Sequence, residues 1–407
     1  MLEKHTSKNG LRVVLENIPS VRSVTIGIWV LTGSRNETEQ NNGVSHFLEH
    51  MFFKGTNTRS PQDIAEAFDS IGGQVNAFTS KEYTCFYAKV LDTYKDYALE
   101  ILADMFFNSA FDEEEMEREK KVVYEEIKMY EDTPDDIVHD VLATASFGNH
   151  PLGYPILGTE THLTSFTPET LRNYMQERYV PENVVISVAG NVDKSFIGRV
   201  DEYFGSYSFG PTQTSLERPN FLGKNINRHK DTEQAHLCLG YDGFAVGDKH
   251  TYSLVIMNNV LGGSMSSRLF QEVREKQGLA YSVFSYHSSF LDNGLLTIYA
   301  GTGNKQLPIL QETIHQTVDT LRKNGLTDKE LTNSKESFKG NLMLSLESTS
   351  SRMSRNGRNE LLLRRHRTLD EMIQEIDAVS HESIQHVIDV VFGKPPASAV
   401  IAPEQEE

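Results

Sequence analysis

The stretch that organises this sequence is Asn42-Gly-Val-Ser-His-Phe-Leu-Glu-His-Met-Phe-Phe-Lys-Gly55. Its apolar residues, with a glycine near each end, predict a short and largely buried helix. On a helix His46 and His50 lie one turn apart on the same face, and Glu49 follows His46 by three residues. The three side chains can therefore converge on one point.

This arrangement indicates a metal site. Two neutral imidazoles form a good zinc pair, and a third protein ligand would leave a fourth position for a water that Glu49 could deprotonate. The order His-x-x-Glu-His is the reverse of the commoner zincin motif. The same string also occurs on helices whose histidines only hydrogen-bond to neighbours. The apolar flanks favour a metal, because buried imidazole and carboxylate groups left unpaired cost on the order of 1–3 kcal/mol each.

The length and composition predict a globular protein of more than one domain. A chain of 407 residues exceeds one typical core, and 38% hydrophobic residues suffice for ordinary folding. Neither a signal-type apolar segment at the N-terminus nor a run of ~18 apolar residues is present, so we expect a soluble, unexported, cytoplasmic protein with no membrane partner. Cys85 and Cys238 lie far apart and match no Cys-x-x-Cys pattern, which indicates neither a disulfide framework nor a thiolate zinc site.

The charge is strongly acidic and unevenly distributed. A net charge of -18 argues against nucleic acid as a partner. Residues 1–215 contain 18 Lys+Arg and 33 Asp+Glu, a net charge of -15, so the half with the two histidines is the acidic one. This charge could attract cationic substrates, or it could simply keep the surface hydrated.

Alternation and capping residues predict the elements around the histidine helix. Ser60-Pro61 begins a helix that Gly72-Gly73 ends, and a further helix is expected from Thr167. Strands are expected at 11–15, 22–32, 74–80, 83–90 and 184–189, and another helix at 93–108.

A long acidic helix is expected from about Glu113 to Glu131, started by an Asp112 cap and stopped at Asp132-Thr-Pro134. Glu119 and Glu126 lie two turns apart on it, among valines and other apolar residues. At least one of these carboxylates should face apolar surroundings, where it needs a cation. Glu126 is thus a candidate metal ligand.

The pattern repeats after about half the chain. The helix at Thr167 is followed by a strand, and the helix at Ser380, 213 residues later, is followed by a strand at 397–402. Phe86-Tyr-Ala88 and Ile298-Tyr-Ala300 lie 212 apart, and the helix starts at Asp112 and Thr327 lie 215 apart. This periodicity indicates an internal duplication.

We therefore predict an α+β fold of two homologous domains, each a mostly antiparallel sheet covered by helices. The first would span residues 1–210 and the second 222–407, with a linker rich in Gly, Ser and Pro from Gly205 to Pro219. The second copy lacks His-x-x-Glu-His at 252–261 and a glutamate pair at 334–341. We expect it to hold substrate or to dimerise instead.

The sequence resembles the pitrilysin/insulinase family of zinc peptidases over essentially its whole length, in the short-chain branch that includes mitochondrial processing peptidase and bacterial processing proteases. The matching motifs are His46-Phe-Leu-Glu49-His50, Glu126 76 residues after His50, Gly72-Gly-Gln-Val-Asn-Ala-Phe-Thr79, Gly262-Gly-Ser-Met-Ser-Ser-Arg-Leu-Phe270, and Arg274 with Tyr281.

The resemblance implies a role for each of these residues. His46, His50 and Glu126 would bind one zinc ion per chain, Glu49 would be the general base, and Glu119 would orient the site from outside the ligand set. The segment at Asn76 and Ala77 would bind the substrate as an added strand, and Arg274 and Tyr281 would hold substrate carbonyls.

The resemblance also implies how chains assemble and act. Long-chain relatives have four such domains, so two chains of this length would form a homodimer in which Arg274 and Tyr281 of one protomer complete the zinc site of the other. The expected activity is endopeptidase cleavage of peptides or unfolded segments inside an enclosed chamber. The alternative is a non-catalytic structural or partner subunit, which in this family typically has an incomplete ligand set.

Overall fold

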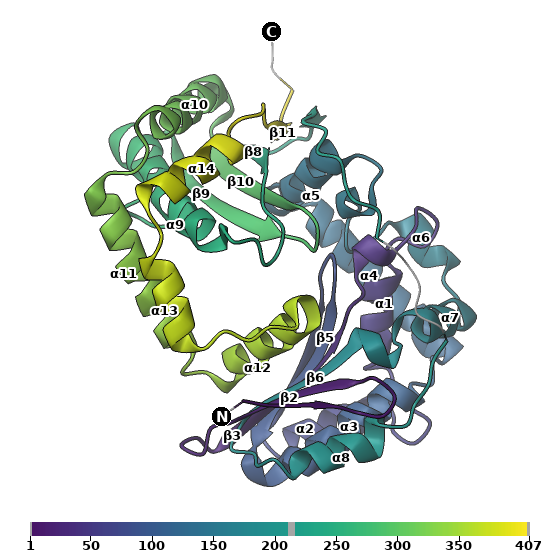
Figure 1. The fold of residues 1–407 in the computed structure, drawn as a ribbon. Helices are drawn as coiled ribbons and strands as arrows, with labels where there is room; N and C mark the ends of the chain where they lie inside the picture. Colours follow the sequence, from purple (N-terminus) through teal and green to yellow (C-terminus); the bar gives the residue numbers. More distant parts are fainter. Residues whose placement is uncertain (1, 211–215, 405–407) are drawn as a thin grey trace. The chain divides into compact units, whose positions relative to one another are not determined.

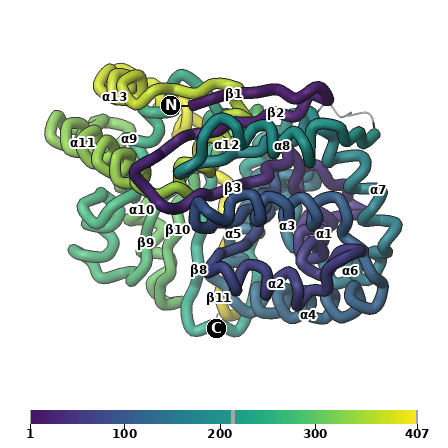
Figure 2. The backbone as a smooth tube through the Cα atoms, turned by 90° about the horizontal axis from the view of Figure 1, so that it is seen from below, coloured from purple at the N-terminus to yellow at the C-terminus, as the bar shows by residue number. Residues whose placement is uncertain are grey.

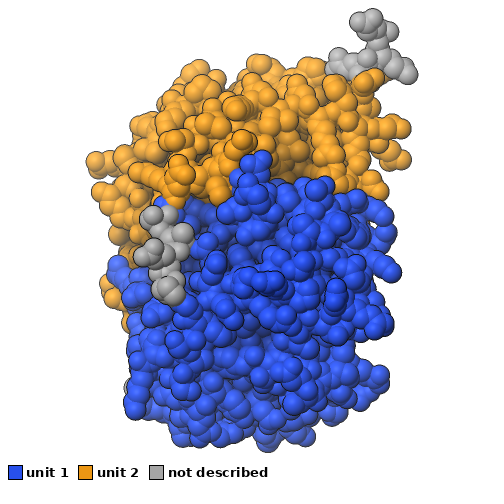
Figure 3. All heavy atoms as spheres, turned by 90° about the vertical axis from the view of Figure 1, so that its right-hand side faces the viewer, with its two compact units in different colours: residues 1–128, 154–216, 344–366 blue, residues 129–153, 217–343, 367–407 orange. Residues whose placement is uncertain are grey.

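A computed structural model describes residues 2–210 and 216–404. The chain divides into two compact units (Figure 3). Unit 1 contains Met1–Lys128, Tyr154–Leu216 and Leu344–His366, and unit 2 contains Met129–Gly153, Glu217–Met343 and Arg367–Glu407. Residues 211–215, within the expected linker, lie outside the described residues. The two predicted domains, 1–210 and 222–407, were defined by the internal repeat and not by contacts, and their boundaries stay a prediction.

Unit 1 is built on a six-stranded sheet in the order β1-β2-β6-β3-β5-β4. All neighbours are antiparallel except β2 and β6, which are parallel. The strands are β1 (Leu2–Thr6), β2 (Arg12–Asn17), β3 (Ser23–Val30), β4 (Gln74–Thr79), β5 (Thr84–Leu91) and β6 (Val184–Gly190). β4 is therefore the terminal strand of this sheet on one side.

Both faces of this sheet are covered, because its strands alternate between two apolar cores. Ile26 and Ile28 of β3 face the larger core, which includes residues of α1 (Val44–Met51), α3 (Lys95–Asn108) and α8 (Phe196–Phe204). Figures 1 and 2 show α3 and α8 side by side. Trp29 faces the other way and packs with Met353 of α12 (Thr349–Arg358), a helix from the C-terminal half of the chain.

Unit 2 repeats this plan without a counterpart of β1 among the described residues. Its sheet has the order β7-β11-β8-β10-β9, with β7 and β11 parallel and the other neighbours antiparallel. The strands are β7 (Asn225–His229), β8 (Ala235–Asp242), β9 (Ala280–Ser289), β10 (Gly294–Thr302) and β11 (Ala397–Ala402). The matching order supports the expected duplication, and the α+β fold class is confirmed.

The helices of unit 2 also cover both faces of its sheet. α9 (Thr251–Leu261), α10 (Leu307–Asn324) and α14 (His381–Val391) contribute to one core. α5 (Pro134–Phe147), from the N-terminal half, packs Val138 and Leu142 on the opposite face against Cys238 and Tyr299. The remaining helices are α2 (Pro61–Asp69), α4 (Glu113–Glu131), α6 (Glu160–Ser165), α7 (Pro168–Arg178), α11 (Asp328–Ser345) and α13 (Leu369–Asp377).

Candidate metal centre

The start of α1 is fixed by a glycine and a buried carboxylate. Gly43 precedes the helix with φ at +93°, and a Cβ there would lie 2.7 Å from the carbonyl oxygen of Leu157. The carboxylate of Glu37 is buried and accepts hydrogen bonds from the backbone amides of Gly43 and Ser45, each at 2.8 Å. A negative charge at a helix N-terminus is favourable, so these contacts set the place of the residues that follow.

Three of the expected site residues lie together in unit 1. His46 and His50 come from α1 and Glu126 from α4, and their donor atoms all lie within 4.8 Å of one another. The two histidine Nε2 atoms are 3.2 Å apart, and the carboxylate oxygens of Glu126 lie 3.7 Å from Nε2 of His46 and 3.5 Å from Nε2 of His50. Tetrahedral ligands with bonds of 2.0–2.1 Å lie about 3.4 Å apart, so this donor set fits a zinc-sized ion.

Glu119 lies where an orienting group for His50 is expected. One of its oxygens is 2.7 Å from Nδ1 of His50, and the other is 2.6 Å from Nζ of Lys54. Its side chain is only 5% exposed. The contact on Nδ1 leaves Nε2 of His50 directed to the other two donors, which is how ligating histidines are usually oriented.

The two histidines differ in charge in the metal-free site. Burial and the neighbouring His50 lower the pKa of His46 to about 4. Burial also disfavours the charged form of His50, but its hydrogen bonds with Glu119 and Glu126 outweigh that effect and raise its pKa to about 9. At neutral pH one ring is therefore neutral and the other is protonated.

Glu49 points to the end of strand β4. Its Oε2 accepts a hydrogen bond of 2.5 Å from the hydroxyl of Thr79, the last residue of that strand. Burial raises the pKa of Glu49, against the opposing effect of this hydrogen bond. A carboxylate that is held by one oxygen and has a raised pKa is suited to receive a proton at the other oxygen.

The expected substrate-binding residues lie in separate units. Asn76 and Ala77 are on the terminal strand β4 of unit 1, where Asn76 is exposed. Arg274 and Tyr281 are neighbours in unit 2, and Tyr281 is 79% exposed. The guanidinium carbon of Arg274 lies 4.5 Å from the ring centre of Tyr281 and 4.7 Å from that of Phe270. Two aromatic faces thus hold this cation.

Three contacts of site residues were not predicted from the sequence, those of Lys54, Thr79 and Phe270. Each lies within a motif already quoted, Lys54 in the first stretch and Phe270 at the end of the Gly262 motif. Lys54 and Glu119 are 65 positions apart and Thr79 and Glu49 are 30 apart, so only the folded chain brings these pairs together. Phe270 lies four residues before Arg274, so helical spacing could have indicated that contact.

Within the part of the chain that the structure describes, these features define a duplicated α+β protein with one set of metal donors, located in its first copy. Residues 12–160 match the family model of insulinase, peptidase family M16, and residues 165–338 match that of the peptidase M16 inactive domain. The chain belongs to this family, which confirms the resemblance. The label of the second model agrees with the lack of His-x-x-Glu-His in the second half.

Related chains match over nearly their full lengths. An uncharacterized zinc protease of Bacillus subtilis is 62% identical over 403 residues, which cover 99% of this chain and 98% of that protein. An uncharacterized zinc protease of Streptomyces coelicolor is 40% identical over 415 residues, covering 100% and 90% respectively.

Solved structures show the same fold. A protease from Helicobacter pylori superposes with a TM-score of 0.91 at 24% identity, covering 99% of both chains. A structure described as a peptidase M16 inactive domain from Pseudomonas fluorescens superposes with a TM-score of 0.92 at 19% identity, covering 100% of this chain and 99% of that one. Among the described residues, none of the helices combines the length and the apolar character needed to span a membrane.

Proposed function

We propose that this chain is a zinc-dependent endopeptidase that hydrolyses peptides or unfolded segments inside an enclosed chamber. The observation that carries the proposal is the convergence of His46, His50 and Glu126, with Glu49 on the same helix as the two histidines. Each chain would hold one zinc ion on these three donors. The zinc protease names of the relatives support this metal. A non-catalytic subunit would have no need of a complete donor set together with Glu49.

Zinc, when bound, supplies Lewis acidity that polarises the scissile carbonyl and eases deprotonation of the attacking water. Glu49 then acts as general base, taking the water proton on the oxygen that Thr79 leaves free and passing it to the leaving amine. Glu119 keeps His50 in the ligating orientation through Nδ1.

Strand β4 is the proposed binding edge for the substrate. It ends the sheet of unit 1, and its pairing with β5 uses only one of its two edges. An extended peptide would add there as a further strand, through main-chain hydrogen bonds at Asn76 and Ala77 that accept varied side chains. Processing of diverse peptides follows from this mode of binding.

A homodimer with composite sites is part of the proposal. Arg274 and Tyr281 of one protomer would hold substrate carbonyls at the metal centre of the other, where charge develops during cleavage. We also propose a cytoplasmic location. Cys85 and Cys238 are both free and buried, as suits a reducing compartment.

The test is digestion of a peptide library by the purified protein, with cut sites identified by mass spectrometry and zinc measured per chain. We expect about one zinc per chain and cleavage that a chelator abolishes. Glu49→Gln should retain zinc but lose at least ~10²-fold in rate, because general-base catalysis is removed. The matched control is Glu125→Gln, an exposed glutamate on α4 that pairs with Lys128. Full activity of Glu49→Gln, or a zinc-free active protein, would refute the proposal.

A further inference from the structure

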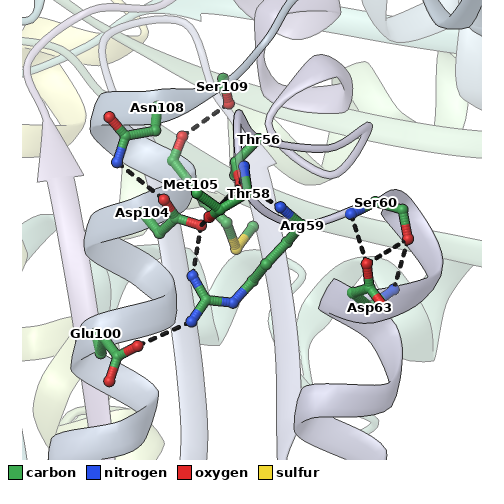
Figure 4. Close-up of polar contacts among 10 residues, drawn as sticks. All are labelled: Thr56, Thr58, Arg59, Ser60, Asp63, Glu100, Asp104, Met105, Asn108 and Ser109. Carbon is green, nitrogen blue, oxygen red and sulfur yellow. Dashed lines mark hydrogen bonds and ion pairs between the residues drawn. The ribbon is translucent and has the colours of Figure 1, made fainter.

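The turn that follows α1 is firmly attached to α3. The backbone amide of Ala110 donates to the carbonyl of Gly55 at 3.1 Å, and that of Asn57 donates to the carbonyl of Asn108 at 3.0 Å. Asp104 of α3 gathers the side chains of this region, as Figure 4 shows. Its oxygens accept hydrogen bonds from Thr56 at 2.8 Å, Thr58 at 3.3 Å, Arg59 at 2.6 Å and Asn108 at 2.8 Å.

Lys54 lies in this turn and reaches α4. Its Nζ is 2.6 Å from Oε2 of Glu119, and its side chain is 29% exposed. Because Oε1 of the same carboxylate contacts Nδ1 of His50 at 2.7 Å, each oxygen of Glu119 has a separate partner. A carboxylate fixed at both oxygens cannot rotate about its last bond without losing a charge-assisted hydrogen bond.

The contact with Glu119 fixes the ring of His50, whereas the ring of His46 lacks a contact of this kind among the described residues. Nδ1 of His46 is buried and has no hydrogen-bond partner among the residues that the structure describes. Among those residues, Glu119 is therefore the group that orients the histidine pair through an Nδ1 atom, by its contact with His50. Anything that holds Glu119 in place also holds this donor set.

We propose that Lys54 is a positioning residue of the metal centre, which fixes Glu119 so that Glu119 in turn directs Nε2 of His50 at the ion. The inference rests on the proposed function, since it takes His50 as a metal ligand. Among the described residues, the ion pair of Lys54 is with Glu119, which lies outside the set of metal donors. The attachment of its turn to Asp104 gives it a defined position from which to act.

A positioning role and simple charge repulsion predict opposite changes in zinc affinity when Lys54 is replaced. A cation near the site repels a divalent ion, so its removal would strengthen zinc binding if charge alone mattered. If Lys54 positions Glu119, its removal instead weakens zinc binding. Outer contacts of this kind contribute about 10–100-fold to metal affinity, and an indirect contact should lie at the lower end, about tenfold.

The experiment measures zinc affinity by competition with a chelator, at one pH, for the full-length protein. Lys54→Met should bind zinc about tenfold more weakly, and Lys54→Arg should stay within about threefold of the wild type because it retains a donor. In a Glu119→Ala background the same Lys54→Met change should have little effect, since the carboxylate it acts on is gone. The matched control is Lys128→Met, which removes an exposed cation from α4 and should leave affinity unchanged.

The outcomes separate this inference from the proposed function. A wild-type protein that binds no zinc would refute the function. With zinc bound by the wild type, unchanged or stronger binding by Lys54→Met would overturn the positioning role, and that single folded variant is decisive. An equal loss in both backgrounds, or a Lys54→Arg protein as weak as Lys54→Met, would also overturn it.

Discussion

Zinc affinity should depend steeply on pH, because His50 is protonated in the metal-free site. Its pKa of about 9 lies well above neutrality, while the pKa of His46, about 4, lies far below it. Binding must therefore remove one proton, from Nε2 of His50, and the proton on Nδ1 stays with its contact to Glu119. Since the raised pKa favours the protonated ring at low pH, affinity falls as pH decreases.

The size of the effect follows from the same pKa. At pH 7 a group with a pKa two units higher is about 99% protonated, which weakens binding by about 100-fold or ~2.7 kcal/mol. Affinity should rise about tenfold per pH unit from pH 6 to 8 and level off near pH 9. Protonation of Glu126 should not weaken zinc binding further near pH 6, because its hydrogen bond with His50 lowers the pKa of Glu126.

The assay is competition with a chromophoric chelator across pH 6 to 9, corrected for protonation of the chelator. Calorimetry in two buffers of different ionisation enthalpy counts the proton released at pH 7. Glu119→Gln serves as the comparison. Loss of that carboxylate lowers the pKa of His50, so the zinc affinity of this variant should stop rising at a lower pH than that of the wild type. An affinity that is constant between pH 6 and 8, or zinc binding at pH 7 without release of a proton, would refute the reasoning.

Three further predictions concern other parts of the site. Thr79→Val should lower kcat about tenfold with KM little changed, because a hydrogen bond to a carboxylate contributes ~1.5–3 kcal/mol. Thr79→Ser keeps the hydroxyl and should retain the activity, so an equal kcat in the two variants would contradict this role. Mixing Glu49→Gln with Arg274→Ala chains should restore part of the activity if sites are composite, whereas no rescue despite subunit exchange would mean that each chain uses its own Arg274. Gly43→Ala should destabilise the protein by more than ~1 kcal/mol, measured by denaturant unfolding, because its φ is +93° and the added Cβ would meet the Leu157 carbonyl.

Local signals in the sequence predicted the helices and strands that carry their own caps and alternation. Ser60 caps α2, with Pro61 in its first turn, and Thr167 and Ser380 cap α7 and α14. The predicted long acidic helix matches α4, Glu113–Glu131. These elements are encoded within a few residues, so spacing alone suffices to find them.

Strand β1 and helix α5 are among the elements that escaped prediction, because their stability is not local. Strand β1 has the sequence Leu-Glu-Lys-His-Thr, which lacks an apolar alternation, and it is held by main-chain pairing with β2. Pro134 predicted the end of one helix but is also the first residue of α5. The apolar face of α5 packs on strands about 100 and 260 residues later in the chain, so no nearby residue indicates this helix.

The site was predictable only where one helix supplies the spacing. His46, Glu49 and His50 follow from the turn of α1, but the place of Glu126 relative to them depends on how α4 packs, and the family resemblance supplied it. The contacts of Thr79 and Lys54 depend on tertiary structure in the same way.

The covering of Trp29 by α12 has a consequence for biosynthesis. The ribosome completes the strand with Trp29 early, but residues 349–358, which shield that indole, emerge only near the end of translation. At about 5–20 residues per second the delay is on the order of tens of seconds. During this interval the nascent chain presents an uncovered apolar surface, and a truncated product ending before α12 would carry that surface permanently and should aggregate.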